Sequence, residues 1–66
     1  MLFKCCASAK INNELTYDIW VGNYKDQAEA RNAAFKRAVE VQGYVWDDIG
    51  RQIPALLDWK AEPVEE

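Results

Sequence analysis

The first candidates for chemistry in this chain of 66 residues are two adjacent cysteines, Cys5 and Cys6. A nucleophilic cysteine needs a base, usually histidine, to form its thiolate, and the chain contains no histidine. Adjacent thiols also lack the spacing with which cysteines surround one metal ion. We therefore expect no cysteine-based reaction and no metal site, and we interpret both thiols as small apolar residues of a strand.

The second candidate is the aspartate pair, Asp47 and Asp48. General acid–base catalysis needs two carboxyl groups that face one pocket from different environments, and neighbours in sequence seldom converge in that way. We expect this pair to cap a helix or to lie in solvent. The three glycines are far apart, so the sequence has no glycine-rich phosphate loop. The sequence therefore favours a protein that is not an enzyme and holds no cofactor.

Two alternating segments, residues 2–11 and 15–22, predict a β-hairpin with Asn12-Asn13-Glu14 as its turn. Alternation puts every second side chain on the same face of a strand. The predicted core face of the first strand carries Phe3, Cys5, Ala7, Ala9 and Ile11. The predicted core face of the second strand carries Leu15, Tyr17, Ile19 and Val21, which leaves Thr16, Asp18 and Trp20 on the outer face.

The segment from Gln27 to Gln42 predicts an amphipathic helix, because it is rich in alanine and straight-chain helix formers. Asp26 precedes Glu29 by three residues, which is the spacing of an N-terminal capping box. Gly43 predicts the end of the helix, because glycine is the usual residue just after a helix. The apolar side of this helix carries Ala30, Ala34, Ala38 and Val41, and small residues of this kind favour close packing on a sheet.

The remainder of the chain allows more than one interpretation. Residues 45–52 fit a single helical turn that begins at Asp47, and Ile53 should be extended because it precedes Pro54. Residues 55–61 alternate as a third strand does, although Pro54 would also suit the first turn of a helix. We favour the strand, because a sheet of two strands is rarely stable. The prediction is an α+β domain over residues 1–61, a small antiparallel sheet of order β-β-α-β with one helix on one face, and an acidic tail over 62–66.

Composition limits the partners that this chain can have. The net charge is −3, whereas proteins that bind nucleic acid usually present a basic face to the phosphates. The segment Met1-Leu2-Phe3-Lys4 lacks the pattern of a signal peptide, and no apolar run approaches the roughly 18 residues of a membrane span. We therefore expect a cytoplasmic protein without a membrane partner, for which nucleic acid is an unfavoured ligand.

The three tryptophans are the most informative residues for binding, because Trp buries a large area at low entropy cost. Core packing is the simpler interpretation of Trp46 and Trp59, whereas Trp20 suits the core and an exposed binding surface equally. Acidic side chains near these rings would steer the chain toward a basic surface. The predicted partner-binding residues are Trp20, Asp18, Asp47, Asp48 and Trp46.

The segment from Trp20 to Ala30 resembles the strand–turn–helix junction of the DNA-binding domains at the N-termini of phage integrases. It is also similar to one half of the sporulation-related peptidoglycan-binding domains. The overall plan resembles short accessory proteins of phages and mobile elements, several of which inhibit a host enzyme or defence complex. This resemblance implies an inhibitor of host machinery such as CRISPR or restriction complexes, and no functional residue is carried over from it.

We therefore favour a protein-binding module that docks on a host protein, with a second copy of the chain as another possible partner. An unpaired strand edge invites both kinds of contact. The alternative is a small nucleic-acid-binding domain that resembles the N-terminal domain of phage integrases. Its phosphate contacts would come from the basic residues Lys4, Lys10, Lys25, Arg31 and Arg37.

Overall fold

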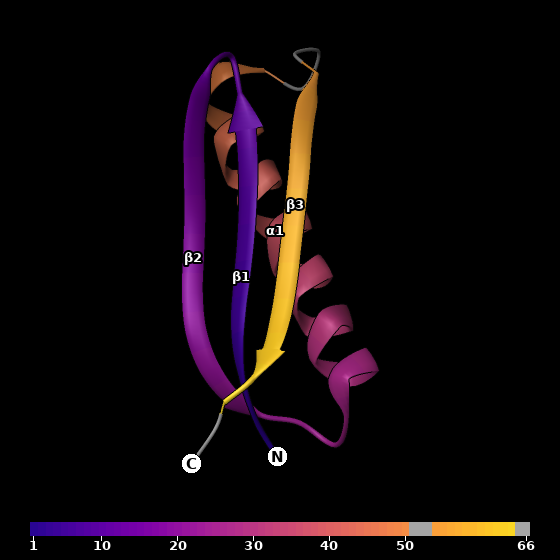
Figure 1. Cartoon of the computed structure of the whole chain (residues 1–66). Helices are drawn as coiled ribbons and strands as arrows, with labels where there is room; N and C mark the ends of the chain where they lie inside the picture. The colour runs from indigo at the N-terminus through magenta and orange to yellow at the C-terminus, as the bar shows by residue number, and fades with distance from the viewer. Residues whose placement is uncertain (51–53, 65–66) are drawn as a thin grey trace.

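The chain folds into one three-stranded antiparallel sheet with a long helix across one face (Figure 1). The computed structural model describes residues 1–50 and 54–64. Its elements are β1 (Leu2–Ile11), β2 (Glu14–Asn23), α1 (Gln27–Ile49) and β3 (Ala55–Pro63). The first strand is central, because the order in the sheet is β2-β1-β3. The predicted α+β class and β-β-α-β order are confirmed.

The turn between β1 and β2 contains two residues, Asn12 and Asn13, with φ angles of 55° and 67°. Two positive φ angles are the mark of a type I′ turn, whose twist matches that of the flanking strands. The turn places Ile11 opposite Glu14, and this register continues along the hairpin without a bulge. The predicted turn was one residue longer, and that difference reverses which face of β2 each side chain occupies.

The predicted core face of β2 is therefore wrong. The face of β2 that was predicted to be solvent-exposed is the one that points toward the helix. Leu15, Tyr17, Ile19 and Val21 are all exposed, on the side of the sheet away from α1. Trp20 lies opposite Cys5 and Asp18 lies opposite Ala7, so both share the face of the buried β1 side chains.

The core lies between α1 and the central strand. All five residues predicted for the core face of β1 are buried, from Phe3 to Ile11. The predicted apolar side of the helix is buried as well, with Ala30, Ala34 and Ala38 completely inaccessible. Because these side chains are so small, the helix backbone can approach the sheet closely. α1 lies mainly over β1 and β3 and makes few contacts with β2.

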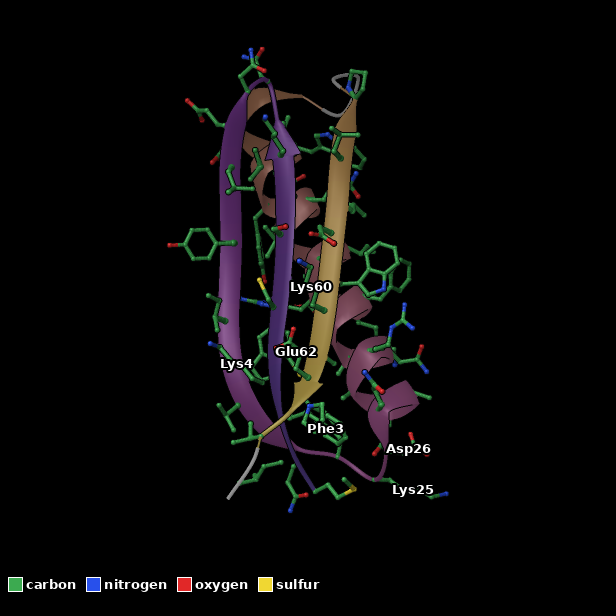
Figure 2. All side chains as sticks on the ribbon, in the orientation of Figure 1. Phe3, Lys4, Lys25, Asp26, Lys60 and Glu62 are labelled. Carbon is green, nitrogen blue, oxygen red and sulfur yellow. The ribbon has the colours of Figure 1, made fainter. Side chains whose placement is uncertain are left out.

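The start of α1 is the one that the sequence predicts. The Asp26 carboxylate accepts a hydrogen bond from the Glu29 backbone N–H at 2.9 Å, and the Glu29 side chain accepts one from the Lys25 backbone N–H. These contacts satisfy donors that have no partner inside the helix. Figure 2 shows Lys25 and Asp26 in the loop that leads into the helix.

The predicted end of the helix is wrong, because α1 continues through Gly43 to Ile49. Its C-cap is Gly50, which has φ +99° and donates a hydrogen bond from its backbone N–H to the Trp46 carbonyl at 2.7 Å. The extension is favoured because Val45 and Trp46 pack against Ile11 and Val41 in the core. A glycine inside a helix costs only about 1 kcal/mol, which such packing outweighs.

Residues 55–61 form a strand, as favoured, and β3 extends to Pro63 at the start of the predicted tail. β3 pairs with β1 in a register that puts Ala61 opposite Cys5 and Trp59 opposite Ala7, on the helix side. The predictions for residues 51–53 and for the end of the tail at 65–66 lie outside the described residues. Within the described residues, no helix is both long enough and apolar enough to cross a membrane.

Candidate protein-interaction surface

The face of the sheet opposite α1 carries a row of exposed apolar side chains along β2. Leu15, Tyr17, Ile19 and Val21 occupy alternate positions, so their side chains point to the same side. Their exposed fractions are 60%, 60%, 51% and 59%. We call these four residues the β2 stripe. Single exposed apolar residues are common on proteins, whereas a continuous row suggests an interaction surface.

The rest of this open face is mostly polar. Lys4, Cys6, Ser8 and Lys10 of β1 lie directly beside the β2 stripe. On the far side of β1, the strand β3 contributes Glu62, Lys60, Asp58 and Leu56 to the same four rows. Lys4, Lys60 and Glu62 lie in front of the sheet in Figure 2, on the side away from α1. Four of the exposed apolar side chains therefore lie at the β2 border, while the centre and the β3 border carry charges of both signs together with one exposed apolar residue, Leu56.

The β2 stripe also borders a strand edge that pairs with no other strand in the described part of the chain. In a hairpin with a two-residue turn, the residues that flank the turn exchange hydrogen bonds, and bonded and non-bonded pairs then alternate. The even-numbered residues of β2 therefore bond to β1, whereas the backbone N–H and C=O groups of the β2 stripe point away from the sheet. Natural edge strands are commonly protected by charged side chains, proline or a bulge. β2 has no lysine, proline or bulge, and of its two charged residues Glu14 adjoins the turn and Asp18 is bonded to Arg37.

The opposite edge of the sheet has such protection. β3 carries Asp58, Lys60 and Glu62 on the open face and ends at Pro63. Charged side chains and a terminal proline hinder the addition of another strand. The two edges therefore differ, and β2 is the one open to pairing.

Two of the predicted partner-binding residues, Trp20 and Asp18, lie on the helix side of β2. Trp20 is half-buried and packs against the core cluster of Phe3, Cys5 and Ala30, while its Nε1 donates a hydrogen bond to the Tyr24 hydroxyl at 2.8 Å. The Asp18 carboxylate accepts a hydrogen bond from Arg37 Nε, also at 2.8 Å. Trp20 and Asp18 thus connect β2 to Tyr24 and to Arg37 of α1, on the face of the sheet that α1 covers.

The other three predicted residues lie near the end of α1. Trp46 packs against the cluster that contains Ile11 and Val41, whereas Asp47 and Asp48 are exposed. The five predicted residues are therefore divided between two parts of the molecule, and none belongs to the β2 stripe. The signal that could have located the stripe is the Asn-Asn turn, since two residues that both tolerate positive φ predict a two-residue connection.

The titratable groups with shifted pKa values have structural explanations. Burial raises the pKa of the Cys5 thiol, and a hydrogen bond with Tyr24 partly opposes this shift. Hydrogen bonds from Arg37 to Asp18 and Glu40 raise the pKa of its guanidinium group. No group of three or more His, Cys, Asp or Glu side chains within residues 1–50 and 54–64 is arranged to hold a metal ion.

A shallow groove between α1 and β3 is a second surface feature that sequence reasoning missed. Arg31, Phe35 and Trp59 line it, and the two rings meet edge to face with their centroids 4.9 Å apart. The ring contact joins the helix to the edge strand β3. This contact has a structural role, whereas no ring contact joins the β2 stripe to another element within residues 1–50 and 54–64.

Comparison of the chain with protein-family models, with curated proteins and with solved structures found no match.

Proposed function

We propose that this chain is a non-enzymatic protein-binding module and that the β2 stripe is its binding surface. The observation that supports the proposal is a row of four large apolar side chains, each at least half exposed, beside an unpaired strand edge. Burial of apolar area contributes about 25 cal/mol per Å², so a partner that covers the row gains substantial free energy. The surrounding lysines and carboxylates would form the polar rim of such an interface.

The partner that we propose is a host protein in the cytoplasm, which the chain inhibits by occupying its surface. Small size and net negative charge suit a phage-type inhibitor of a host or defence complex such as CRISPR or restriction machinery. An acidic chain is drawn toward basic surfaces, including those that normally hold nucleic acid. Asp47 and Asp48, exposed at the end of α1, would add to this attraction.

The test is affinity capture from host-cell lysate with three forms of the chain: the unmodified chain, Tyr17→Lys and Tyr44→Lys. Tyr17 and Tyr44 are 60% and 64% exposed, but only Tyr17 belongs to the β2 stripe. The two substitutions therefore change charge and size equally at two different places. Circular dichroism should show that all three forms are folded before capture begins.

We expect one protein to be retained by the unmodified chain and by Tyr44→Lys, and to be lost with Tyr17→Lys. A charged ammonium group placed in an apolar interface must lose its hydration, which explains the expected loss. Equal retention by all three forms would show that the β2 stripe is not the binding surface. Loss with both substitutions would point to nonspecific capture.

Nucleic-acid binding is the second candidate, through Lys4 and Lys10 on the central strand of the open face. Glu62 lies opposite Lys4 in the neighbouring strand, and Arg37 is already bonded to two carboxylates. These acidic neighbours weaken the attraction for phosphate, so we rank this function below protein binding. Fluorescence anisotropy with labelled DNA and RNA at low salt tests it, and absence of binding there would end it.

A further inference from the structure

We infer that β2 pairs with the β2 strand of a second copy of this chain, antiparallel about a two-fold axis at Ile19. The pairing would join two three-stranded sheets into one continuous sheet with both helices on the same side. The inference deepens the proposed function and rests on it in one respect, since the same β2 stripe is used. Figure 1 shows that β2 forms one border of the sheet and that α1 lies behind the sheet.

The backbone of β2 supplies the first argument. Its outward N–H and C=O groups belong to the odd-numbered residues Leu15, Tyr17, Ile19, Val21 and Asn23, as the two-residue turn requires. In the Ile19-centred arrangement, each outward residue lies opposite another outward residue, so both N–H and both C=O groups of every such pair find partners. Strand addition of this kind is a common way to satisfy an exposed edge.

The side chains support this register. Ile19 lies opposite its own copy, Tyr17 opposite Val21, and Leu15 opposite Asn23. Cross-strand pairs of aromatic and β-branched residues stabilise sheets, whereas like charges directly opposite each other destabilise them. An axis at Asp18 would bring its two carboxylates together, whereas the Ile19 axis puts Asp18 opposite Trp20. The only other charge on β2 is Glu14, which lies outside the paired residues 15–23.

The helices leave room for the second copy, because α1 lies mainly over β1 and β3. Neighbouring strands are roughly 4.8 Å apart, so the axes of the two helices would be separated by about four strand spacings, or about 19 Å. A helix with its side chains is about 10 Å wide, so the helices would not collide. Trp20 and Asp18 would line the space between them.

The area involved suits a reversible dimer rather than a permanent one. The paired edge is about 30 Å long at roughly 3.4 Å per residue. Pairing would bury on the order of 500 Å² on each chain, near the lower limit for specific protein interfaces. It would also place the two β2 stripes side by side on the open face. That joined apolar surface is the one that a host partner would contact.

Disulfide trapping tests the inference with purified chain alone. Cys6 lies directly opposite position 19 within one chain, so the background variant is Cys6→Ser, which prevents an internal disulfide. In that background we compare Ile19→Cys with Tyr17→Cys under mild oxidation. Residues paired at the axis have Cα atoms about 5.5 Å apart, which a disulfide can span, whereas two copies of position 17 would be far beyond its reach.

We expect rapid dimer formation with Ile19→Cys and little or none with Tyr17→Cys. Light scattering of the unmodified chain should show a mass that rises toward twice the monomer value with concentration. Ile19→Pro removes one outward N–H without removing a bond to β1, and Ile19→Lys adds a charge at the axis, so both should remain monomeric.

The inference is overturned if the unmodified chain stays monomeric throughout and Ile19→Cys does not cross-link. It is also overturned if a mixture of Tyr17→Cys and Ile19→Cys chains cross-links while Ile19→Cys alone does not, since that result indicates the Asp18 axis. A monomeric chain that still captures a partner leaves the proposed function intact. A dimer that captures nothing supports this inference and removes the proposed function.

Discussion

Replacement of Gly43 by alanine should stabilise the folded chain, because Gly43 lies inside α1. Alanine favours a helix interior over glycine by about 1 kcal/mol, since glycine loses more backbone freedom on folding. The φ angle of Gly43 is not positive, and a Cβ built at this position meets no atom within 4 Å other than its chain neighbours and the backbone of its own helix, so neither strain nor a clash offsets the gain. We expect the free energy of unfolding to increase by about 1 kcal/mol. The Tm should rise by roughly 4–8 °C in a domain of this size.

Gly50 provides the matched control at the true end of the helix. Its φ of +99° and ψ of 141° are unfavourable for any residue with a Cβ. Alanine at this position should therefore lower the free energy of unfolding by about 1–3 kcal/mol. Urea unfolding followed by circular dichroism, at one fixed protein concentration, measures both effects on the same scale.

The signs of the two effects decide where α1 ends. If the helix stopped before Gly43, that glycine would occupy a left-handed cap, and alanine would be destabilising there. A loss of stability in Gly43→Ala would therefore refute the reasoning. An unchanged or increased stability in Gly50→Ala would refute the assignment of Gly50 as the cap.

Three further predictions concern the core and the helix start. Asp26→Ala should lower the free energy of unfolding by about 1 kcal/mol through loss of the cap to Glu29, whereas Asp26→Asn should change it little; urea titration compares them. Phe3→Ala should cost about 3–5 kcal/mol, a large part of the roughly 3–10 kcal/mol that a chain of this length possesses, so circular dichroism should show extensive unfolding. Burial raises the Cys5 pKa, so the folded chain holds that proton more tightly than the unfolded chain does. The Cys5 thiol should therefore contribute its full stabilisation at pH values below its pKa in the unfolded chain. That contribution should be lost as the pH rises through its higher pKa in the folded chain. Titration with a thiol reagent should find Cys6 reactive and Cys5 protected, and equal reactivity would contradict this.

Most of the fold could be predicted from local patterns. Alternation identified β1 and its buried face, the Asp26–Glu29 spacing identified the helix start, and alternation after Pro54 identified β3. Each of these signals is contained within a few neighbouring residues, and each agrees with the tertiary packing. The helix end was missed because Val45 and Trp46 gain their stability from Ile11, a residue on a distant strand.

The candidate surface could not be predicted, because its position depends on one residue of turn length. Alternation shows that Leu15, Tyr17, Ile19 and Val21 share a face, but it does not show which face that is. Their apolar character favoured the core, whereas the register assigns the core side to Asp18 and Trp20. Trp20 fits there because Tyr24 accepts the hydrogen bond of its indole nitrogen. An apolar row on the solvent-exposed face of a sheet breaks the usual pattern, and such departures are expected where a protein binds a partner.

The central position of β1 also determines the order in which the molecule can fold. The hairpin of β1 and β2 joins neighbouring segments and can form in roughly 1–10 μs, whereas β3 must return across the whole chain to place Pro63 beside Phe3. Distant pairings of this kind are the slow steps of folding. Until β3 pairs with β1, both edges of the hairpin remain open, and during synthesis that interval lasts at least until β3 has left the ribosome. The time that β3 takes to pair with β1, rather than the final stability, would then determine how long the chain is exposed to aggregation and proteolysis.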